Sequence, residues 1–528
     1  MTATITPYRS ALPLGRDGFA QLLHAEWTKF RTVRGWLIGL LVAAALTVGV
    51  GVLSAAGSHA SVCAVQPGKP PACHAIPAPP QGPGGEPVTD QFYFVHQPLT
   101  GDGSITVRVD SLTGLILSGT ASPDEPLAGA RPGVQPWSKA GLILKANTTQ
   151  GSAYAAIMVT GGHGVRWQHD YTHDVAGAPG AVSAASPRWL RLTRSGDTVT
   201  GYDSTDGTRW TRVGSAQLAG LPATVPAGVF AASPDHVQTS QHVGRSSSTG
   251  GPTRATATID RLSVQGGWAA GAWTGAQVGG GGRVGGFTQS GGTLTVSGSG
   301  DIAPAVGSGP SPGLGPDRTL VGTFAGLIAL IVVAALFVTT EYRRGLIRTT
   351  LAASPRRGRV LAAKAVVTGI VTFLVGLAAA AIAVPLGQHI LRSNGQYLYP
   401  VSTLTELRMI VGTAALLAMA AVAALALGAV LRRGAGAVTA VIVAIVLPYI
   451  LATASLLPAG AAQWLLRLTP AAAFAVQQSL IQYPQVSGEY TPANGYYPLT
   501  PWAGFAVLCA YTAIALAVAT VLLRRRDA

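Results

Sequence analysis

The sequence predicts an α-helical membrane protein with six transmembrane helices and an inserted all-β domain outside the membrane. Only 11% of the 528 residues are charged and the mean hydropathy is +0.37, a combination typical of membrane proteins. Six apolar runs reach or exceed the ~20 residues that a bilayer-spanning helix needs. Between the first two runs lies a long segment rich in Gly, Ser, Thr and Pro, whose short alternating apolar stretches indicate β-strands.

The fourth and fifth predicted spans are separated only by the basic turn 432–436, and Pro448 predicts a kink in the fifth. The first run is interpreted as a retained helix rather than a signal peptide, because it begins only at Trp36 and is too long for a signal core. The spans are 36–56, 320–339, 361–386, 407–431, 437–457 and 502–523, and the outer loop 458–501 is expected to hold short interfacial or re-entrant helices at 464–468 and 471–480.

Lys and Arg residues predict that both termini are cytoplasmic, in a multi-pass protein of the cell (plasma) membrane. They flank the spans at 1–35, 340–360, 432–433 and 524–528, whereas the opposite short loops hold only Arg392 and Arg467. Segment 57–317 is therefore expected to be extracytoplasmic. The net charge of +15 could indicate nucleic-acid binding. Because the charges flank apolar runs instead of forming one basic domain, no nucleic acid is expected.

Segment 57–317 is predicted to begin with a Pro-rich tether, 58–86, and to continue as an antiparallel sandwich or jelly roll. The turn sequences Ser195-Gly196 and Asp206-Gly207 separate neighbouring runs. The expected strands are 104–109, 141–144, 154–159, 189–194, 198–202, 210–213, 227–231 and 255–264.

This segment resembles a concanavalin-like jelly-roll module of secreted bacterial proteins over about residues 90–264. The motifs that carry the resemblance are Phe92-Tyr93-Phe94-Val95, 99–109, 140–144, 189–197 and 203–210. In such modules a Gly-Gly-x-Leu-x-Val type strand usually comes first, but here it comes last, at 290–302. We therefore expect a circularly permuted arrangement in which the late strand closes the same sheet and brings the domain's ends together.

Cys63 and Cys73 bracket a Pro-rich loop directly after the first span. A disulfide between them is expected if that side is extracytoplasmic, and two unpaired thiols are the alternative. Cys509 lies inside an apolar run and is interpreted as a small core residue.

The predicted β domain contains no catalytic residues by motif, because the paired-carboxylate signature Glu-x-Asp-x-x-Glu is absent. His169 and His173 are interpreted as part of a polar loop, and 203–206 as a hairpin turn, so no metal site is predicted. A glycan or another cell-surface ligand could stack on exposed aromatic rings, with ordinary core aromatics as the favoured alternative. The candidates are Trp137, Trp167, Tyr171 and Trp210.

Two motifs lie on the predicted cytoplasmic side. Before the first span, Phe19, Leu23, Trp27 and Phe30 have near-helical spacing and predict an amphipathic helix in the membrane interface; a generic basic flank is the alternative. After the second span, 341–351 is helix-compatible and could transmit force from a soluble partner. A carboxylate at the membrane boundary is costly unless paired, and we expect Arg344 or Arg348 to pair with Glu341. A plain basic loop is the alternative.

These motifs resemble the ABC-2 type transporter permease family, most closely its actinobacterial members. The matching sequences are 25–34, Glu341-Tyr342-Arg343-Arg344-Gly345 and 351–356, and the resemblance covers about 17–58 and 318–526. It implies a cytosolic ATP-binding subunit that holds ATP and magnesium and receives the first cytoplasmic loop. The implied coupling element includes Glu341, Tyr342, Arg343, Arg344, Gly345, Arg348 and Thr349.

The absence of a phosphate-binding loop around any lysine agrees with a chain that is not itself an ATPase and needs no cofactor of its own. We predict a permease subunit, expected to be an exporter that works as a dimer of permease units in the lipid bilayer. Nearly charge-free spans favour an amphiphilic or lipid-like substrate. The alternatives are a membrane-anchored glycan-binding sensor and a membrane-bound hydrolase.

Overall fold

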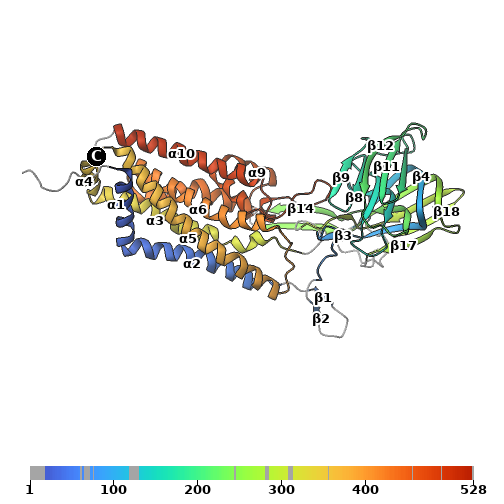
Figure 1. Cartoon of the computed structure of the whole chain (residues 1–528), viewed down its shortest axis with the longest axis horizontal. Coiled ribbons are helices and arrows are strands. Elements are labelled where there is room, and N and C mark those ends of the chain that lie inside the picture. Colours follow the sequence, from blue (N-terminus) through green and yellow to red (C-terminus); the bar gives the residue numbers. More distant parts are fainter. Residues whose placement is uncertain are drawn as a thin grey trace, which may run out of the picture.

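The computed structural model has a helix bundle at one end and a β domain at the other (Figure 1). The helices α1 (Phe19–Thr32) and α4 (Leu346–Ala353) and the C-terminal end of the chain lie at the end of the bundle remote from the β domain. The structure describes residues 18–59, 62–64, 72–74, 77–117, 130–242, 245–279, 285–306, 313–354, 356–454, 456–488 and 490–525, with the backbone alone at 62–64, 72–74, 237–242, 245–250 and 353.

Within the described residues, six helical segments are long and apolar enough to span a membrane, in agreement with the six that the sequence predicts. Several extend beyond the predicted ends, above all the third. The segments are α2 (Arg34–Gly57), the 3₁₀ turn η1 (Pro316–Leu320) with α3 (Thr323–Arg343), α5 (Arg357–Ser393), α6 (Thr403–Leu431), α7 (Gly434–Val441) with α8 (Leu447–Thr453), and α10 (Pro501–Arg525).

Helix α6 lies at the centre of the bundle and packs against α3, α5 and α10. Small residues allow this close approach. A Cβ at Gly428 would lie 2.6 Å from Val338 Cγ1, and one at Gly376 would lie 2.9 Å from Leu417 Cδ1. In the fifth span, α7 and α8 are joined by a π-helical turn, Ile442–Val446, directly before Pro448. The turn stands where proline, which lacks an N–H, disturbs the helical ladder.

The end of the bundle that faces the β domain is closed by short helices between the fifth and sixth spans. They are α9 (Ala459–Leu468) and the 3₁₀ segments η3 (Pro470–Gln477) and η4 (Pro492–Asn494). Every residue of η3 is buried, and Phe474 stacks on Tyr449 with ring centroids 3.8 Å apart. Protein therefore surrounds η3, whereas Trp464 and Leu468 of α9 are 60% and 64% exposed.

The β domain is built on one 14-stranded sheet in which every pairing is antiparallel. Strand β4 (Phe92–Ile116) organises it: its first half pairs with β13 and β17, and its second half pairs with β10 and β16. The other bounds are β5 (Arg131–Pro132), β6 (Lys139–Lys145), β7 (Tyr154–Thr160), β8 (Val165–His169), β9 (His173–Ala176), β10 (Arg188–Ser195), β11 (Thr198–Ser204), β12 (Thr211–Gln217), β13 (Thr224–Ala232), β16 (Thr253–Trp268), β17 (Thr274–Val278), β18 (Gly286–Ser290) and β19 (Thr293–Gly298).

Strands β6 and β7 are buried along their whole length because apolar side chains cover both of their faces. Leu142 and Ile157 belong to the larger core of the domain, whereas Ile143 and Met158 belong to a smaller, aromatic-rich core. A strand buried on both faces is apolar throughout, so it lacks the alternation of a half-exposed strand.

The expectation that the late strand closes the same sheet is confirmed, since β19 pairs with β16 and β18. The ends of the domain also meet. Strand β3 (Val88–Asp90), which enters the domain, pairs with β20 (Ile302–Pro304), which leaves it. Two further hairpins complete the described strands, β1 (Val62–Ala64) with β2 (Ala72–His74) and β14 (His236–His242) with β15 (Arg245–Gly251).

Two buried ion pairs hold these entry and exit strands to β6. Lys145 Nζ lies 2.7 Å from Asp90 Oδ2, and Lys139 Nζ lies 2.6 Å from Asp301 Oδ1. The two lysines are the last and first residues of β6, so one strand fixes both connections to the membrane part. The tertiary structure thereby joins the β domain to its linkers through charges buried in the smaller core.

The β domain also contacts the end of the bundle that faces it. Gln485 Nε2 donates to Thr172 O at 3.3 Å, and Leu314 exchanges backbone hydrogen bonds with the α5–α6 loop, donating to Tyr397 O at 2.9 Å and accepting from Tyr399 N at 3.0 Å. The apolar side chains of Ala303, Val306 and Val486 pack together in the same region. These contacts fix the domain against the bundle.

Candidate functional site

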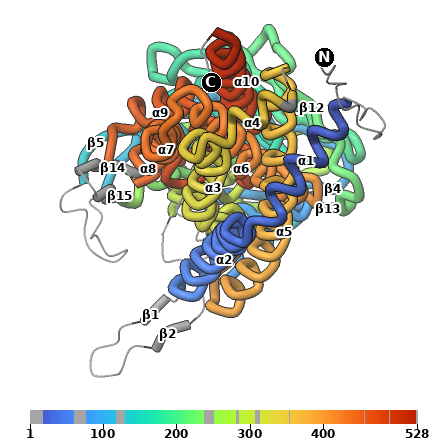
Figure 2. Tube along the Cα trace, turned by 90° about the vertical axis from the view of Figure 1, so that its left-hand side faces the viewer, coloured from blue at the N-terminus to red at the C-terminus, as the bar shows by residue number. Residues whose placement is uncertain are grey.

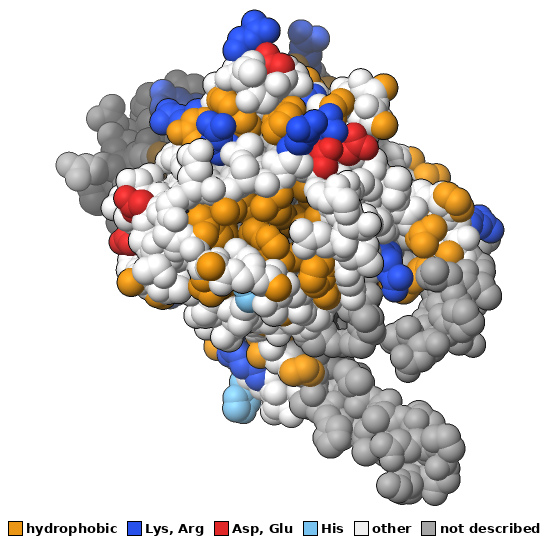
Figure 3. Space-filling model, turned by 90° about the vertical axis from the view of Figure 1, so that its right-hand side faces the viewer, with side chains coloured by type: hydrophobic (Ala, Val, Ile, Leu, Met, Phe, Trp, Pro, Cys, Tyr) orange, Lys and Arg blue, Asp and Glu red, His pale blue; other side chains and the backbone are white. Residues whose placement is uncertain are grey.

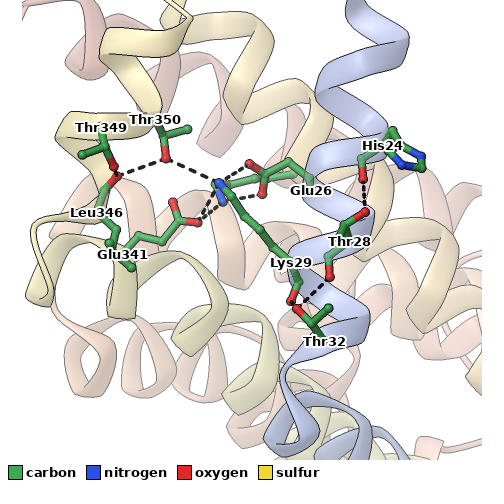
Figure 4. Close-up of polar contacts among 10 residues, drawn as sticks. His24, Glu26, Thr28, Lys29, Thr32, Glu341, Leu346, Thr349 and Thr350 are labelled. Carbon is green, nitrogen blue, oxygen red and sulfur yellow. Dashed lines mark hydrogen bonds and ion pairs between the residues drawn. The ribbon is translucent and has the colours of Figure 1, made fainter.

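Charged side chains meet at the end of the bundle opposite the β domain (Figure 4). Lys364 on α5 is buried, and its Nζ lies 2.6 Å from Glu26 Oε2 on α1 and 2.6 Å from Glu341 Oε1 on α3. We call Glu26, Lys29, Glu341 and Lys364 the charge cluster. Its four members come from three helices, α1, α3 and α5, so it ties together parts of the chain that are distant in sequence.

Lys29 links the cluster to the short helix α4. Its Nζ lies 2.8 Å from Glu26 Oε1, 3.4 Å from Glu341 Oε1 and 3.4 Å from Thr350 Oγ1. Burial alone would lower the pKa of Lys29, but the hydrogen bond and charge of Glu26, together with Glu341, raise it overall. Lys29 is therefore charged at neutral pH, and Thr350 brings α4 into the same network.

Helical spacing and aromatic packing position these groups. Glu26 and Phe30 lie four residues apart on the buried face of α1, and Phe337 and Glu341 have the same spacing on α3. The rings of Phe30 and Phe337 meet edge to face with centroids 5.2 Å apart, and Lys364 Nζ lies 4.7 Å from the Phe337 centroid. These rings form the apolar side of the cluster, where poor screening strengthens attraction between its charges.

Burying such charges is costly unless they are paired; among the described residues, Glu341 Oε2 is buried without a hydrogen-bond partner, while Glu341 Oε1 is paired. Glu26 and Lys364 are almost fully buried, and Glu341 is 8% exposed. Both carboxylates share Lys364, and Lys29 supplies a second cation to each. The cluster is formally neutral, with two carboxylates and two ammonium groups. A movement of α1 against α3 could exchange one ion pair for another without leaving a lysine unpaired.

The predicted helix 341–351 is interrupted. Helix α3 ends at Arg343, Gly345 adopts a left-handed conformation at φ 68°, and α4 begins at Leu346. Glycine suits this position because a side chain would strain the backbone there. Ile347 is buried against the bundle, whereas Arg343, Arg344, Arg348 and Thr349 are exposed together with Gly345. Tyr342 is half-buried, with the Arg432 guanidinium 5.3 Å from its ring centroid.

The expectation that Arg344 or Arg348 pairs with Glu341 is wrong. The described cations within ion-pair distance of Glu341 are Lys364 and Lys29. Sequence reasoning missed Lys364 because it lies in an apolar run treated as charge-free, and it used Glu26 only as part of a motif. The sequence did contain a signal for this cluster: one lysine, Lys364, lies within a span, and Glu26 and Glu341 lie beside two other spans. Charges at such positions need partners.

The interfacial helix needs a similar correction. Of the four residues assigned to it, Phe30 is buried against Phe337 and does not face the lipid. Leu23 is half-buried and packs against the same core. Phe19 and Trp27 are 39% and 43% exposed, so they are the members of the set with rings available to the interface.

Most of the proposed ligand-binding aromatics are core residues. Trp137 is 6% exposed, and Trp167 and Tyr171 are 1% exposed, so these three rings cannot stack on a ligand. The Tyr171 hydroxyl instead donates to Asp90 Oδ2 at 2.8 Å. Trp210 is half-exposed, but the Arg191 guanidinium lies 3.9 Å from its ring centroid and covers it. For Trp137, Trp167 and Tyr171, the structure therefore favours the alternative that they are ordinary core aromatics.

Other candidate sites in the β domain are sparse. The rings of His169 and His173 stack 4.2 Å apart, and no group of His, Cys, Asp or Glu suited to a metal ion occurs in the described part of the chain. The backbone register places Cys63 opposite Cys73, but the side chains of this predicted disulfide lie outside the described residues. Figure 3 shows a hollow of hydrophobic side chains in the far face of the domain, with basic and acidic side chains near its rim.

Comparison with known proteins gives one extended match. A family model described as "ABC-2 family transporter protein" matches residues 153–528, which is more than half of the chain. No curated protein matches the chain. The matched region includes α3 to α10, and therefore α4 and two members of the charge cluster, Glu341 and Lys364. The helices α1 and α2 precede it and pack against it.

Three solved structures resemble part of the chain. A functionally unknown protein from Saccharomyces cerevisiae is 15% identical, with 33% of this chain and 75% of that chain covered and a TM-score of 0.21. Scytalido-glutamic peptidase is 10% identical. The match covers 39% of this chain and 98% of the peptidase, with a TM-score of 0.26. The GH43 protein BlXynB from Bacillus licheniformis is 16% identical, with 25% and 24% covered and a TM-score of 0.16.

Proposed function

The chain belongs to the ABC-2 transporter family, and from this premise we propose that it is the permease subunit of an exporter driven by a separate cytosolic ATPase. The observation that carries the proposal is the junction of α1, α3, α4 and α5 through the charge cluster. Such a junction places an exposed, basic helix directly on three helices of the bundle. ATP and magnesium would be held by the partner, and this chain would supply the membrane path.

The distribution of basic residues supports a cytoplasmic position for α1 and α4. Figure 2 views the molecule from this end and shows α1, α4 and α10 on the side that faces the viewer. Arginines at 343, 344, 348, 356, 357, 359, 524 and 525 lie here, as the positive-inside rule requires of the cytoplasmic side. With this orientation the β domain lies outside the cell, and its antiparallel sheet with a closing late strand supports the jelly-roll interpretation.

The coupling route follows from the contacts. The exposed side chains of Arg343, Arg344, Arg348 and Thr349 would bind the ATPase, and Thr350 on the same short helix touches Lys29. Displacement of α4 would then pull on Lys29 and, through Glu26 and Glu341, on α1 and α3. Lys364 would pass the movement to α5, which spans the membrane. A cluster with alternative pairings can follow such movement with small loss of ion pairing.

An apolar groove of about 280 Å³ supports the proposal of an amphiphilic substrate. Its walls come from α6, α7, α10 and the π-helical turn, and they include Leu427, Ile445, Leu508 and Val518. The charge cluster lies at one end of the bundle rather than at its middle, so it does not line an ion path through this groove. We propose that two permease units assemble around the substrate, with identical units as the simplest case.

The proposal is tested by capturing the ATPase encoded nearest to this chain on the tagged permease. We expect the triple variant Arg343→Ala, Arg344→Ala, Arg348→Ala to reduce capture at least tenfold. A matched control removes three exposed arginines from the β domain, Arg209→Ala, Arg212→Ala and Arg261→Ala, and should capture as wild type does. Absence of capture by the well-folded wild-type chain would instead favour the anchored glycan-binding sensor.

A further inference from the structure

A cavity of about 680 Å³ lies between the first turn of α5 and the last turns of α10, outside the charge cluster. Its lining includes four arginines, Arg356, Arg357, Arg359 and Arg524, together with Gly358, Ala362 and Thr520. Among the described residues, no acidic side chain lines it. Four guanidinium groups around one cavity repel each other, and an anion between them would relieve that repulsion. The positive end of the long helix α5 adds to the attraction.

One of the four arginines holds the cavity together. Arg357 Nη1 donates to Leu523 O at 2.8 Å and thereby joins the start of α5 to the end of α10. The two helices lie side by side here, since a Cβ at Gly358 would make ordinary van der Waals contact with Thr520 Cγ2 at 3.5 Å and with Arg524 Nη2 at 3.7 Å. Arg356, Arg359 and Arg524 are exposed, and no carboxylate in the described part of the chain forms an ion pair with them.

The walls of the cavity continue into membrane-facing surface. On α5, Ala362 lines the cavity, and Val366 and Ile370 follow at four-residue spacing with 40% and 55% exposure. On α10, Val521 is 47% exposed and lies three residues before Arg524. A cationic cavity at the end of two spans, directly above exposed apolar side chains, matches a molecule that carries a phosphate on hydrocarbon chains.

We propose that this cavity binds the phosphate headgroup of an anionic lipid of the inner leaflet. The inference rests on the orientation given in the proposed function, which puts this end of α5 and α10 at the cytoplasmic membrane surface. Arg356, Arg359 and Arg524 contact the headgroup, and Arg357 maintains the gap that receives it. Arginine suits this role because its planar group donates two hydrogen bonds to one phosphate. The bound lipid would lie beside the segment that leads from α4 into α5.

The test uses the full chain, purified without an ATPase in neutral detergent, and native mass spectrometry with added dioleoylphosphatidylglycerol or dioleoylphosphatidylcholine. We expect the anionic lipid to bind and the neutral lipid to bind at least tenfold more weakly. The triple variant Arg356→Gln, Arg359→Gln, Arg524→Gln should lose about a hundredfold, at about fivefold per arginine. The corresponding triple lysine variant should keep part of the affinity, since it keeps the charge but loses the paired hydrogen bonds to the phosphate.

The matched control is Arg343→Gln, Arg433→Gln, Arg525→Gln, which removes three exposed arginines at the same end of the bundle but outside the cavity. An equal loss in this control would overturn the proposal in favour of diffuse surface charge. Competition by millimolar inorganic phosphate would overturn it in favour of a soluble anion. If the variant Arg356→Gln, Arg359→Gln, Arg524→Gln binds lipid as wild type does but no longer captures the ATPase, the cavity binds the ATPase and not a lipid. Reduced lipid binding with normal capture supports the proposal, and failure of capture in wild type bears on the proposed function alone.

Discussion

The β domain and the helix bundle each bury lysine ammonium groups against carboxylates, at distances of 2.6–2.7 Å. In the β domain each lysine has its own aspartate, Lys145 with Asp90 and Lys139 with Asp301. In the bundle Lys364 is shared between Glu26 and Glu341, and half-exposed Lys29 approaches both carboxylates. The two regions therefore contain similar buried ion pairs, but the pairs are one-to-one in the β domain and shared in the bundle.

The partners explain what the difference means. Asp90 Oδ2 also accepts from the Tyr171 hydroxyl at 2.8 Å and from Gly151 N at 2.9 Å, so one carboxylate is held by three donors of a single domain. In the bundle, Lys29 and Glu26 lie on the same helix, but the other three pairs join different helices, and each carboxylate lies within reach of two lysines. The first arrangement specifies one geometry, whereas the second can exchange partners as helices move.

The largest expected effect comes from Lys364→Met. It removes the cation shared by two buried carboxylates and leaves Lys29 as their common partner, so we expect a loss of about 3–5 kcal/mol in the free energy of unfolding. The measurement is thermal unfolding of the purified chain, followed by fluorescence-detected size exclusion. The neutral triple variant Glu26→Gln, Lys364→Met, Glu341→Gln should recover most of the stability without recovering coupling. A Lys364→Met chain as stable as wild type would contradict the assignment.

Asp90→Asn is expected to destabilise the β domain by about 3 kcal/mol, because it leaves the Lys145 ammonium buried without an anion. Burial lowers the pKa of Lys145 and Asp90 partly opposes this shift, so the substitution should lower that pKa further. The folded state then binds fewer protons than the unfolded state, and stability rises with pH. The deficit should therefore shrink as the pH is raised from 7 toward 10.5. ATPase capture should not change, and a pH-independent deficit would argue against a buried charge.

Lys29→Gln should cost at most about 1 kcal/mol in stability, because its side chain is 39% exposed and Lys364 still pairs with both carboxylates. Its effect should appear in coupling: ATPase capture is kept, but stimulation of ATP hydrolysis by the permease falls several-fold. Lys29→Arg, which keeps the charge, should restore part of the stimulation. Full stimulation in the Lys29→Gln chain would mean that the contact with Thr350 transmits nothing.

The smallest effect is expected from Arg108→Gln in the β domain. Arg108 Nε donates to Asp260 Oδ1 at 2.8 Å, but both side chains are partly exposed, so we expect a loss of about 0–1 kcal/mol. The hydrogen bond from Arg108 lowers the pKa of Asp260. The stability that this pair contributes is therefore fully present above pH 3.8, the ordinary pKa of Asp260. It is lost as the pH falls through the lowered pKa of Asp260 in the folded state. Melting temperatures of wild type and variant should differ at pH 7 and converge in acid. A difference that persists at pH 2 would point to lost packing.

Features with a local cause were predictable from the sequence. Length and hydropathy are enough to find six spans, because a bilayer demands a long apolar helix whatever its neighbours are. Alternating apolar residues likewise located β-strands such as β10 and β11, whose buried and exposed residues alternate. A glycine at 345 was recognised as part of a motif, but its left-handed backbone and the break between α3 and α4 became visible only in the structure.

The sequence by itself determined the class of this protein: a six-span chain with a β domain, a basic end, and motifs of a permease. Tertiary structure alone decided the partners, placing Glu26 against Lys364 across 338 positions and Lys139 against Asp301 across 162. It also decided that Trp167 and Tyr171 are core residues rather than ligand contacts. Spans and strands follow from forces that act on neighbouring residues along the chain. Which buried charges meet depends on the packing of distant elements, which no local pattern records.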